Sequence, residues 1–174
     1  FPSAQYEEEC FGTALVFFPV VGAIIGCITI AMCWGASLIT KGLFSAIPAV
    51  TINIWITRAL HIDGLSDVVD AYYATTEPER RLAIMKDPHI GAFGVIAIVL
   101  TIFIKIICIA ELCNQGKWLF IMLPMVLSRN TMVMMAVSLP YARKEGGKAE
   151  VYITNAKLYH FIISLFITLI ISFT

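Results

Sequence analysis

The run from Thr13 to Trp34 contains no charged residue, and it limits the fold more than any other feature of the sequence. A helix needs about 20 mostly apolar residues to cross the hydrocarbon core of a bilayer. In lipid, such a run satisfies its backbone hydrogen bonds internally only as a helix. Further apolar runs follow at about 43–57, 92–113 and 118–139, and from 158 onward. The sequence therefore predicts an all-α, polytopic transmembrane helix bundle with about five spans in this chain.

The composition supports a membrane protein and argues against other classes. The chain is 59% hydrophobic and only 14% charged, whereas a soluble domain carries about 25% charged residues. The net charge is zero and no basic cluster occurs, so we expect no nucleic-acid partner. The five cysteines form no C-x-x-C pair, so we expect them to be small buried apolar residues and not a disulfide framework or a metal site. Residues 1–174 are predicted to form a single integral-membrane catalytic domain. In the first span, Gly22 and Gly26 are spaced to permit close helix contact.

Acidic residues gather in the one long hydrophilic stretch, 61–90. Half of the twelve acidic residues lie between Asp63 and Asp87. If the segment is helical, Asp63, Asp67 and Asp70 stand on one narrow stripe of the helix. Carboxylates on consecutive turns repel each other unless protons or a cation neutralise them. All-oxygen ligands favour Mg²⁺, and Gly64 lets a bulky phosphate approach the backbone. The alternative is a solvated face of an amphipathic helix.

A second cluster follows at 86–89, with the sequence Lys-Asp-Pro-His. A short interfacial helix from Glu77 to Lys86, capped by Thr76, is predicted to precede it. Three spaced carboxylates, this cluster and nearby arginines indicate phosphoryl or phosphodiester transfer. A general base must then take a proton from an attacking hydroxyl, and the candidates are His89, His61 or an aspartate, with His89 preferred.

Arg129 lies near the middle of an apolar run. A charge at that depth costs about 2.5–3.5 kcal/mol on insertion scales. We therefore expect Arg129 to face the bundle interior, where either a carboxylate or a substrate phosphate pairs with it. Lys105 is also within a span, but its side chain is long enough to reach the interface.

The distribution of Lys and Arg predicts the orientation. The side that carries Arg58 and the loops 61–90 and 141–157 has eight basic residues, and the other side has two, Lys41 and Lys117. By the positive-inside rule, the acidic segment faces the cytoplasm from the inner membrane of the cell. Nucleotides and Mg²⁺ are available on that side.

Two other classes of protein compete with a phosphotransferase. An ion-coupled transporter would use intramembrane aspartates, but the three aspartates follow the end of an apolar run and no inverted repeat is visible. A non-catalytic membrane subunit would leave the clustered carboxylates unexplained. Serine or cysteine catalysis finds no supporting arrangement.

The two acidic blocks closely resemble those of the cobalamin synthase (adenosylcobinamide-GDP ribazoletransferase) family. The first is H-I-D-G-L-S-D-V-V-D at 61–70, and the second is E-R-R-L-A-I-M-K-D-P-H-I-G-A-F-G at 79–94. Supporting matches are F-F-P-V-V-G at 17–22, Lys105, Arg129, L-P-Y-A-R at 139–143 and E-G-G at 145–147. The resemblance extends over about 11–147, and the remainder matches by hydropathy. Ser66 replaces a more usual Ala, and His89 occupies a variable position. The family's N-terminal start and its C-terminal region are expected to lie outside this chain.

The resemblance implies the last assembly step of the cobalamin nucleotide loop. A hydroxyl of α-ribazole, or of its 5′-phosphate, attacks the cobinamide-linked phosphorus of adenosylcobinamide-GDP, and GMP leaves. The resemblance implies Mg²⁺ as the cofactor and an enzyme embedded in the lipid bilayer. It does not decide whether the protein forms a homo-oligomer. The metal ligands are then expected to be Asp63, Asp67, Asp70 and Asp87. The catalytic set adds Lys86 and His89 to these four. The substrate-binding set is Arg58, His61, Gly64, Arg80, Arg81, Arg129 and Arg143. Membrane CDP-alcohol phosphotransferases, which also carry an Asp motif, are the alternative enzyme class.

Overall fold

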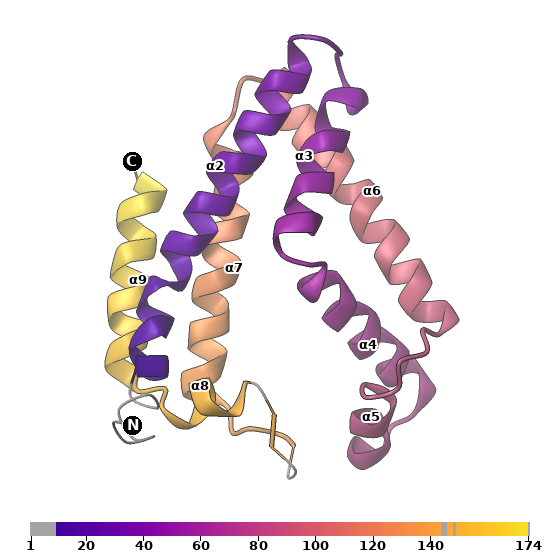
Figure 1. Ribbon diagram of the computed structural model, residues 1–174, viewed down its shortest axis with the longest axis vertical. Helices are drawn as coiled ribbons and strands as arrows, with labels where there is room; N and C mark the ends of the chain where they lie inside the picture. The colour runs from indigo at the N-terminus through magenta and orange to yellow at the C-terminus, as the bar shows by residue number, and fades with distance from the viewer. Residues whose placement is uncertain (1–9, 144–145, 148, 174) are drawn as a thin grey trace, which may run out of the picture. The chain divides into compact units, whose positions relative to one another are not determined.

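The computed structural model describes residues 10–143, 146–147 and 149–173, and every regular element within them is a helix (Figure 1). The elements are the 3-10 turn η1 (Leu15–Phe17) and the helices α2 (Phe18–Ser37), α3 (Leu43–Ile56), α4 (Leu60–Ala74), α5 (Pro78–Ile84), α6 (Ala92–Asn114), α7 (Leu119–Ser138), α8 (Glu150–Thr154) and α9 (Leu158–Phe173). The predicted all-α fold is confirmed. Residues 1–9 with their acidic run, and Lys144, Glu145 and Lys148 of the basic loop, lie outside the described residues.

Three helical segments are long and apolar enough to cross a membrane, namely Cys10–Ser37, Ala92–Asn114 and Leu119–Ser138. The pair α3 and α4 adds a fourth crossing if it is taken as one span bent by 83°. The count differs from the expected five for a physical reason. At 1.5 Å per residue, α3 is only about 21 Å long, whereas the hydrocarbon core is about 30 Å thick. The expected fifth span corresponds to α9, a shorter apolar helix.

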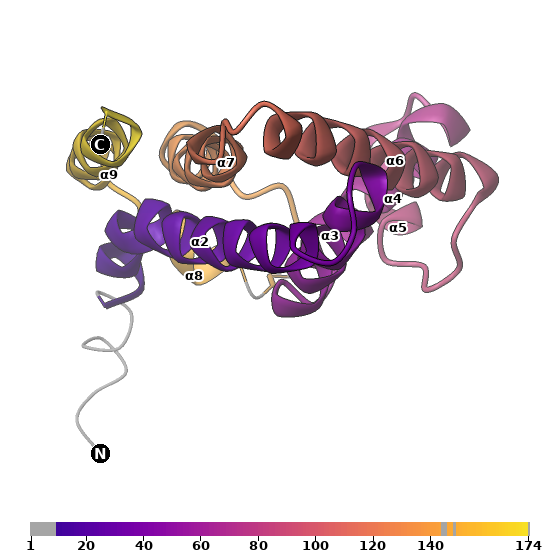
Figure 2. The ribbon, with the colours of Figure 1, turned by 90° about the horizontal axis from the view of Figure 1, so that it is seen from above.

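The chain divides into two compact units, the first made of residues 1–27 and 119–174 and the second of residues 28–118. In the first unit, α7 and α9 lie side by side (Figures 1 and 2). Asn130 and Ser164 join these two helices through a buried hydrogen bond of 2.9 Å. A Cβ atom at Gly22 would fall 2.5 Å from the carbonyl oxygen of Met125, and one at Gly26 would meet Met122. The predicted close helix contact at these glycines is therefore confirmed, and α7 is the partner.

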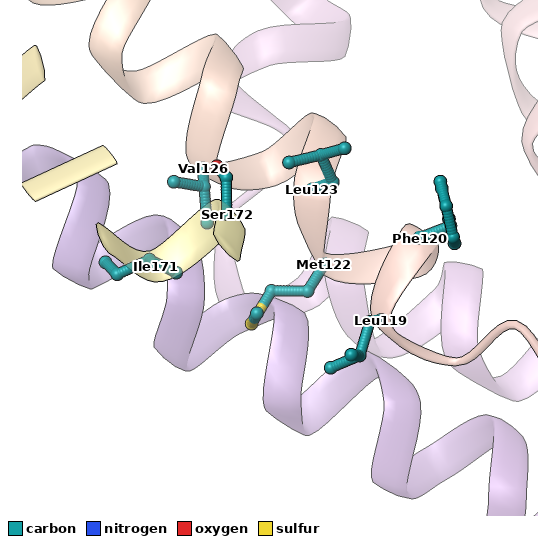
Figure 3. A pocket seen from close by; sticks show the side chains of 7 residues that line it. All are labelled: Leu119, Phe120, Met122, Leu123, Val126, Ile171 and Ser172. Atoms are coloured by element: carbon teal, nitrogen blue, oxygen red, sulfur yellow. The ribbon is translucent and has the colours of Figure 1, made fainter. Parts of the chain in front are cut away.

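The first unit also contains a small apolar cavity of about 140 Å³ between the start of α7 and the end of α9 (Figure 3). Its lining residues are Leu119, Phe120, Met122, Leu123, Val126, Ile171 and Ser172. None of these side chains ionises, so this cavity offers no acid–base or metal chemistry.

In the second unit, the end of α2 lies against the end of α6, where Cys33 and Cys113 form a disulfide. The expectation that the chain has no disulfide is wrong for this pair. The remaining cysteines, Cys10, Cys27 and Cys108, are free and exposed, so they are not the buried residues expected from the sequence. Their exposure is what contact with lipid requires of small apolar side chains.

Helices α3 and α4 pack one after the other along α6 (Figure 1). The chain enters α3 close to the disulfide end of α6, and it leaves α4 beside the start of α6, where Asp70 bonds to Gly91. The segment between therefore travels the length of α6, which is about 35 Å. Together α3 and α4 are long and apolar enough for one bent span, and α4 with its carboxylates is the half that lies furthest from the disulfide.

The break between α3 and α4 has an unusual backbone. Arg58 and Ala59 have φ values of 50° and 57°, in the left-handed region. Their N–H groups donate to the carbonyl oxygens of Trp55 (3.0 Å) and Ile54 (2.8 Å). These bonds satisfy carbonyl groups that would otherwise be unpaired at the end of α3. They also turn the chain, so that α4 starts in a new direction.

Candidate active site

The predicted aspartate helix exists, because α4 runs from Leu60 to Ala74 and carries Asp63, Asp67 and Asp70. Asp63 is exposed, whereas Asp67 and Asp70 are half-buried. The apolar residues Val68 and Tyr72 on the other face are 49% and 63% exposed. A helix that exposes apolar side chains and partly buries carboxylates is suited to lipid on one side and a polar site on the other.

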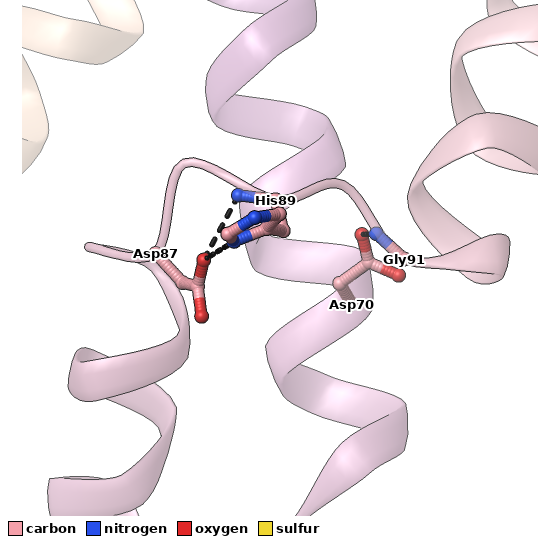
Figure 4. A network of polar contacts seen from close by, with 4 residues as sticks. All are labelled: Asp70, Asp87, His89 and Gly91. Carbon is pink, nitrogen blue, oxygen red and sulfur yellow. Dashed lines mark hydrogen bonds and ion pairs between the residues drawn. The ribbon is translucent and has the colours of Figure 1, made fainter.

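Asp70 binds the start of α6. Its Oδ2 accepts a hydrogen bond from the N–H of Gly91 at 2.7 Å (Figure 4). Its Oδ1 accepts one from the N–H of Gly94 at 2.8 Å. Gly91 is the N-cap residue of α6 and offers no side chain of its own for capping. Asp70 therefore supplies the cap from another helix, and its negative charge lies at the positive end of the α6 dipole.

The two glycines of the second block make this contact possible. A Cβ atom at Gly91 would collide with the Asp70 carboxylate, and one at Gly94 would collide with both Asp70 and Ser66. The sequence shows that glycines occur at these positions, but their role depends on which helix lies opposite, and spacing alone does not give that.

Asp87 and His89 form a second polar pair in the loop between α5 and α6. Oδ1 of Asp87 accepts the backbone N–H of His89 at 2.9 Å and lies 2.6 Å from the ring Nδ1 of the same residue (Figure 4). The backbone hydrogen bond, followed by the ring contact, lowers the pKa of Asp87 below its ordinary value. A carboxylate at Nδ1 orients the imidazole and leaves Nε2 as the nitrogen that faces solvent. His89 thus has the surroundings of a general base.

Helix α5 differs from the prediction at both ends. It begins at Pro78 and ends at Ile84, shorter than the expected segment from Glu77 to Lys86. The predicted cap at Thr76 is wrong, because Glu77 is the N-cap residue and no side chain caps the helix. The hydroxyl of Thr75 accepts the N–H of Glu77 at 3.2 Å. Proline at the first helical position fixes the start, since it has no N–H that needs a partner.

The arginines of α5 have different surroundings. Arg81 donates from Nε to the carbonyl oxygen of Thr75 at 2.8 Å, and its guanidinium lies 5.0 Å from the centre of the Tyr72 ring. It therefore ties α5 to the end of α4 through a hydrogen bond and a cation–π contact. Arg80 and Lys86 are exposed, as phosphate-binding side chains need to be.

The remaining predicted residues are more scattered. His61 lies in the first turn of α4, Arg58 in the break before it, and a Cβ atom at Gly64 would have no heavy atom within 4 Å. That open space is what the predicted approach of a phosphate requires. Arg129 donates to the hydroxyl of Ser128 at 3.1 Å. Arg129 and Arg143 belong to the first unit and the aspartates to the second. The pairing of Arg129 with a carboxylate or a substrate phosphate, and the binding of substrate by Arg143, stay predictions.

A metal ion was predicted on Asp63, Asp67, Asp70 and Asp87. Within the described part of the chain, no three His, Cys, Asp or Glu side chains are gathered closely enough to hold one. Asp70 and Asp87 instead bond to Gly91, Gly94 and His89. The carboxylate donors fit Mg²⁺ chemically, and oxygens that accept one N–H retain a second lone pair. The four-carboxylate ligand set stays a prediction.

An open pocket of about 410 Å³ joins the two blocks. Asp70 and Tyr73 from α4 line it, as do Asp87 and His89 from the loop and Phe93 from the start of α6. The rings of Tyr73 and Phe93 are stacked, with their centres 4.6 Å apart and their planes at 13°. These two aromatic residues were not predicted as site residues. The available signal was their position, with Tyr73 just after the first motif block and Phe93 within the second, but aromatic residues there are also typical of a membrane interface.

The helices long and apolar enough to cross a membrane define this protein as an integral membrane protein. Its second unit carries a pocket lined by Asp70, Asp87 and His89 at the end where α4 meets the start of α6. The whole chain, residues 1–174, matches the family model described as cobalamin-5-phosphate synthase. The chain belongs to this family.

Curated relatives agree with the family. The chain is 36% identical to adenosylcobinamide-GDP ribazoletransferase of Pelodictyon phaeoclathratiforme over 99% of this chain and 68% of that protein. It is 34% identical to the protein of the same name from Chlorobium phaeovibrioides, over 95% of this chain and 67% of the relative. The corresponding protein of Syntrophobacter fumaroxidans is 37% identical over 90% and 63% of the two chains. The chain thus spans about two thirds of the length of these relatives. No solved structure matches it significantly.

Proposed function

We propose that the protein transfers α-ribazole, or its 5′-phosphate, onto adenosylcobinamide-GDP and releases GMP. The observation that carries this proposal is the pocket in which Asp70, Asp87 and His89, from two separate sequence blocks, lie beside the aspartate helix. The curated relatives bear the name of this transfer. In the reaction, a ribazole hydroxyl forms a new bond to the cobinamide-linked phosphorus, and the bond from that phosphorus to the bridging oxygen of GMP breaks.

The chain's own residues divide this work. His89, oriented by Asp87, takes the proton of the attacking hydroxyl through Nε2. Arg80 and Lys86 are exposed, on α5 and in the loop after it, and they neutralise the diphosphate and the departing GMP. Gly64 leaves room for a phosphate against α4. Arg58, His61, Arg81, Arg129 and Arg143 complete the proposed substrate-binding set.

Magnesium is part of the proposal. Asp63 and Asp67 stand one turn apart on α4, and they would hold the ion together with lone pairs of Asp70 and Asp87. When bound, Mg²⁺ would withdraw charge from the phosphorus and stabilise the leaving phosphate. The basic residues Arg58, Arg80, Arg81 and Lys86, in and next to the segment that carries the aspartates, support a site that faces the cytoplasm from the inner membrane.

The test is a transfer assay on the membrane-embedded protein, with adenosylcobinamide-GDP and α-ribazole or its 5′-phosphate as substrates and GMP release as the readout. Chelation with EDTA should abolish release, and added Mg²⁺ should restore it. Asp67→Asn should lower the rate roughly 100-fold, because metal stabilisation of transferred charge amounts to several kcal/mol. Glu111→Gln is the matched control, since Glu111 lies near the other end of α6 and bonds to Gln115 at 2.6 Å. Wild-type turnover by Asp67→Asn would refute the metal assignment.

A further inference from the structure

The pocket between α4 and α6 has an aromatic side that the reaction described above does not use. Tyr73 and Phe93 are stacked on each other, and they remain 62% and 49% exposed. Each ring therefore turns one face to its neighbour and keeps much of its surface open. Ile84 and Ile90 add apolar surface to the same pocket. Flat, exposed aromatic surface of this kind binds planar rings by stacking.

The polar side of the pocket selects among planar rings. Asp87 uses Oδ1 for His89, and Asp70 uses both oxygens for Gly91 and Gly94. The Oδ2 atom of Asp87 lies on the far side of its carboxylate from His89 in Figure 4, and the side chain is 54% exposed, so a ligand can reach it. An ionised carboxylate only accepts hydrogen bonds, so it favours a ring that carries N–H donors. Each of its oxygens has two lone pairs, so Oδ2 has room for such a donor beside the metal ion proposed above. Guanine offers such donors along one edge, whereas the benzimidazole of ribazole, once joined to its sugar, has none.

We infer that this pocket binds the guanine of adenosylcobinamide-GDP, with the base against the Tyr73–Phe93 stack and its N–H edge toward Asp87. The inference rests on the proposed function, and it assigns one part of that substrate to one part of the protein. The volume of about 410 Å³ lies within the range of ordinary ligand pockets. Arg80 and Lys86 are exposed on α5 and in the loop after it, close in sequence to the lining residues Ile84 and Asp87, and the inference assigns the attached phosphates to them.

Tyr72 provides a matched control for Tyr73. The two residues are adjacent on α4, and their exposed fractions are nearly equal at 63% and 62%. Tyr73 lines the pocket, whereas Tyr72 is not among its lining residues and lies under the guanidinium of Arg81. If these tyrosines serve only as anchors at the membrane interface, the two substitutions should have the same effect.

The experiment measures equilibrium binding of GMP to the full chain in nanodiscs, with EDTA present so that metal binding does not contribute. Tyr73→Ala should weaken GMP binding roughly 5- to 100-fold, the range found when a stacking aromatic is removed. Tyr73→Phe, which retains the ring, and Tyr72→Ala should stay within about 3-fold of wild type. Asp87→Asn should reduce the preference for GMP over IMP, because IMP lacks the 2-amino donor.

Equal losses for Tyr72→Ala and Tyr73→Ala, or equal wild-type affinities for GMP and CMP, would overturn the inference. Thermal unfolding of each variant identifies any loss of binding that comes from misfolding. If Tyr73→Ala does not fold, Tyr73→Phe together with the comparison of GMP and CMP decides whether the aromatic ring binds the base. The proposed function is tested separately by GMP release from adenosylcobinamide-GDP. Transfer without Tyr73-dependent GMP binding would refute only the guanine pocket, whereas Tyr73-dependent binding without transfer would refute only the proposed reaction.

Discussion

The carboxylate of Asp70 accepts hydrogen bonds from two backbone N–H groups that lie 21 and 24 residues further along the chain. This contact explains why the second sequence block ends in G-x-x-G, since both glycines lie where a methyl group would strike Asp70. It also holds the end of the Asp87–His89 loop against α4, because Gly91 follows that loop directly. One side chain thus serves the fold and the site together.

Substitution of Gly94 tests this contact. Gly94→Ala should lower the free energy of unfolding by about 1–3 kcal/mol, because the added methyl displaces Asp70 from the cap and crowds Ser66. Gly64→Ala is the matched control in stability, since its added Cβ enters open space inside a helix. It should leave stability unchanged or raise it by up to about 1 kcal/mol. Denaturant titration in detergent, followed by circular dichroism, measures both, and equal stability of the two variants would contradict the capping role.

His89 carries a separate prediction at this scale. His89→Ala should lower the transfer rate roughly 100- to 10,000-fold, the usual contribution of a general base. Added imidazole should restore part of the rate, because Asp87 and the space left by the ring remain. The pKa of Asp87 lies below its ordinary value in the folded protein. Ionised Asp87 therefore holds His89 at neutral pH, and the contact is lost only as the pH falls through that lowered pKa. An unchanged rate in His89→Ala would leave His61 or an aspartate as the base.

At the scale of elements, the broken span decides where the carboxylates lie. An unbroken helix through residues 43–74 would continue in one direction, whereas the left-handed residues Arg58 and Ala59 bend the pair by 83°. Left-handed conformation costs a residue with a side chain about 1–2 kcal/mol. Such strain persists where the surrounding structure requires the geometry, and here the geometry directs α4 along α6.

Substitutions at Ala59 measure this strain. Ala59→Val should destabilise the protein by more than about 2 kcal/mol, because a β-branched residue is a stronger outlier at positive φ. Ala59→Gly should be neutral or up to about 1 kcal/mol more stable, since glycine relieves the strain but gains freedom in the unfolded chain. Ala71, which is buried within α4, is the control, and Ala71→Gly should destabilise. A destabilised Ala59→Gly would show that the break is not strained.

At the scale of the whole chain, hydropathy and motif spacing predicted the all-helical membrane fold, the helix with the three aspartates and the family. They did not predict the bend of the second span, because its cause is two positive φ values at Arg58 and Ala59, residues that do not ordinarily adopt them. The Asp70 cap and the stacked Tyr73 and Phe93 also escaped prediction. Both depend on which helices meet, and hydrophobic periodicity gives the face of a helix but not its partner.

The disulfide between Cys33 and Cys113 links the fold to the orientation of the protein. Both cysteines lie within one turn or so of the helix ends that precede the short connections with Lys41 and Lys117. That end of the unit lies one membrane crossing away from the aspartates. If the aspartates face the cytoplasm, this end faces the outer compartment, where disulfides form and persist.

Counting thiols tests this prediction. The chain has five cysteines, so the denatured protein should react with three equivalents of a maleimide before reduction and with five after it. The three that react first should be Cys10, Cys27 and Cys108. Protein from cells that lack the outer oxidising pathway should show five thiols from the start, because the bond depends on that compartment. The double variant Cys33→Ser with Cys113→Ser should show three thiols in every condition.

Five thiols in wild-type protein from normal cells would mean that this end faces the reducing cytoplasm or that the pair stays open. Cytoplasm-side protease access to Arg80 and Lys86 then separates these two explanations, because the loop is cleaved only if the aspartate end faces inward.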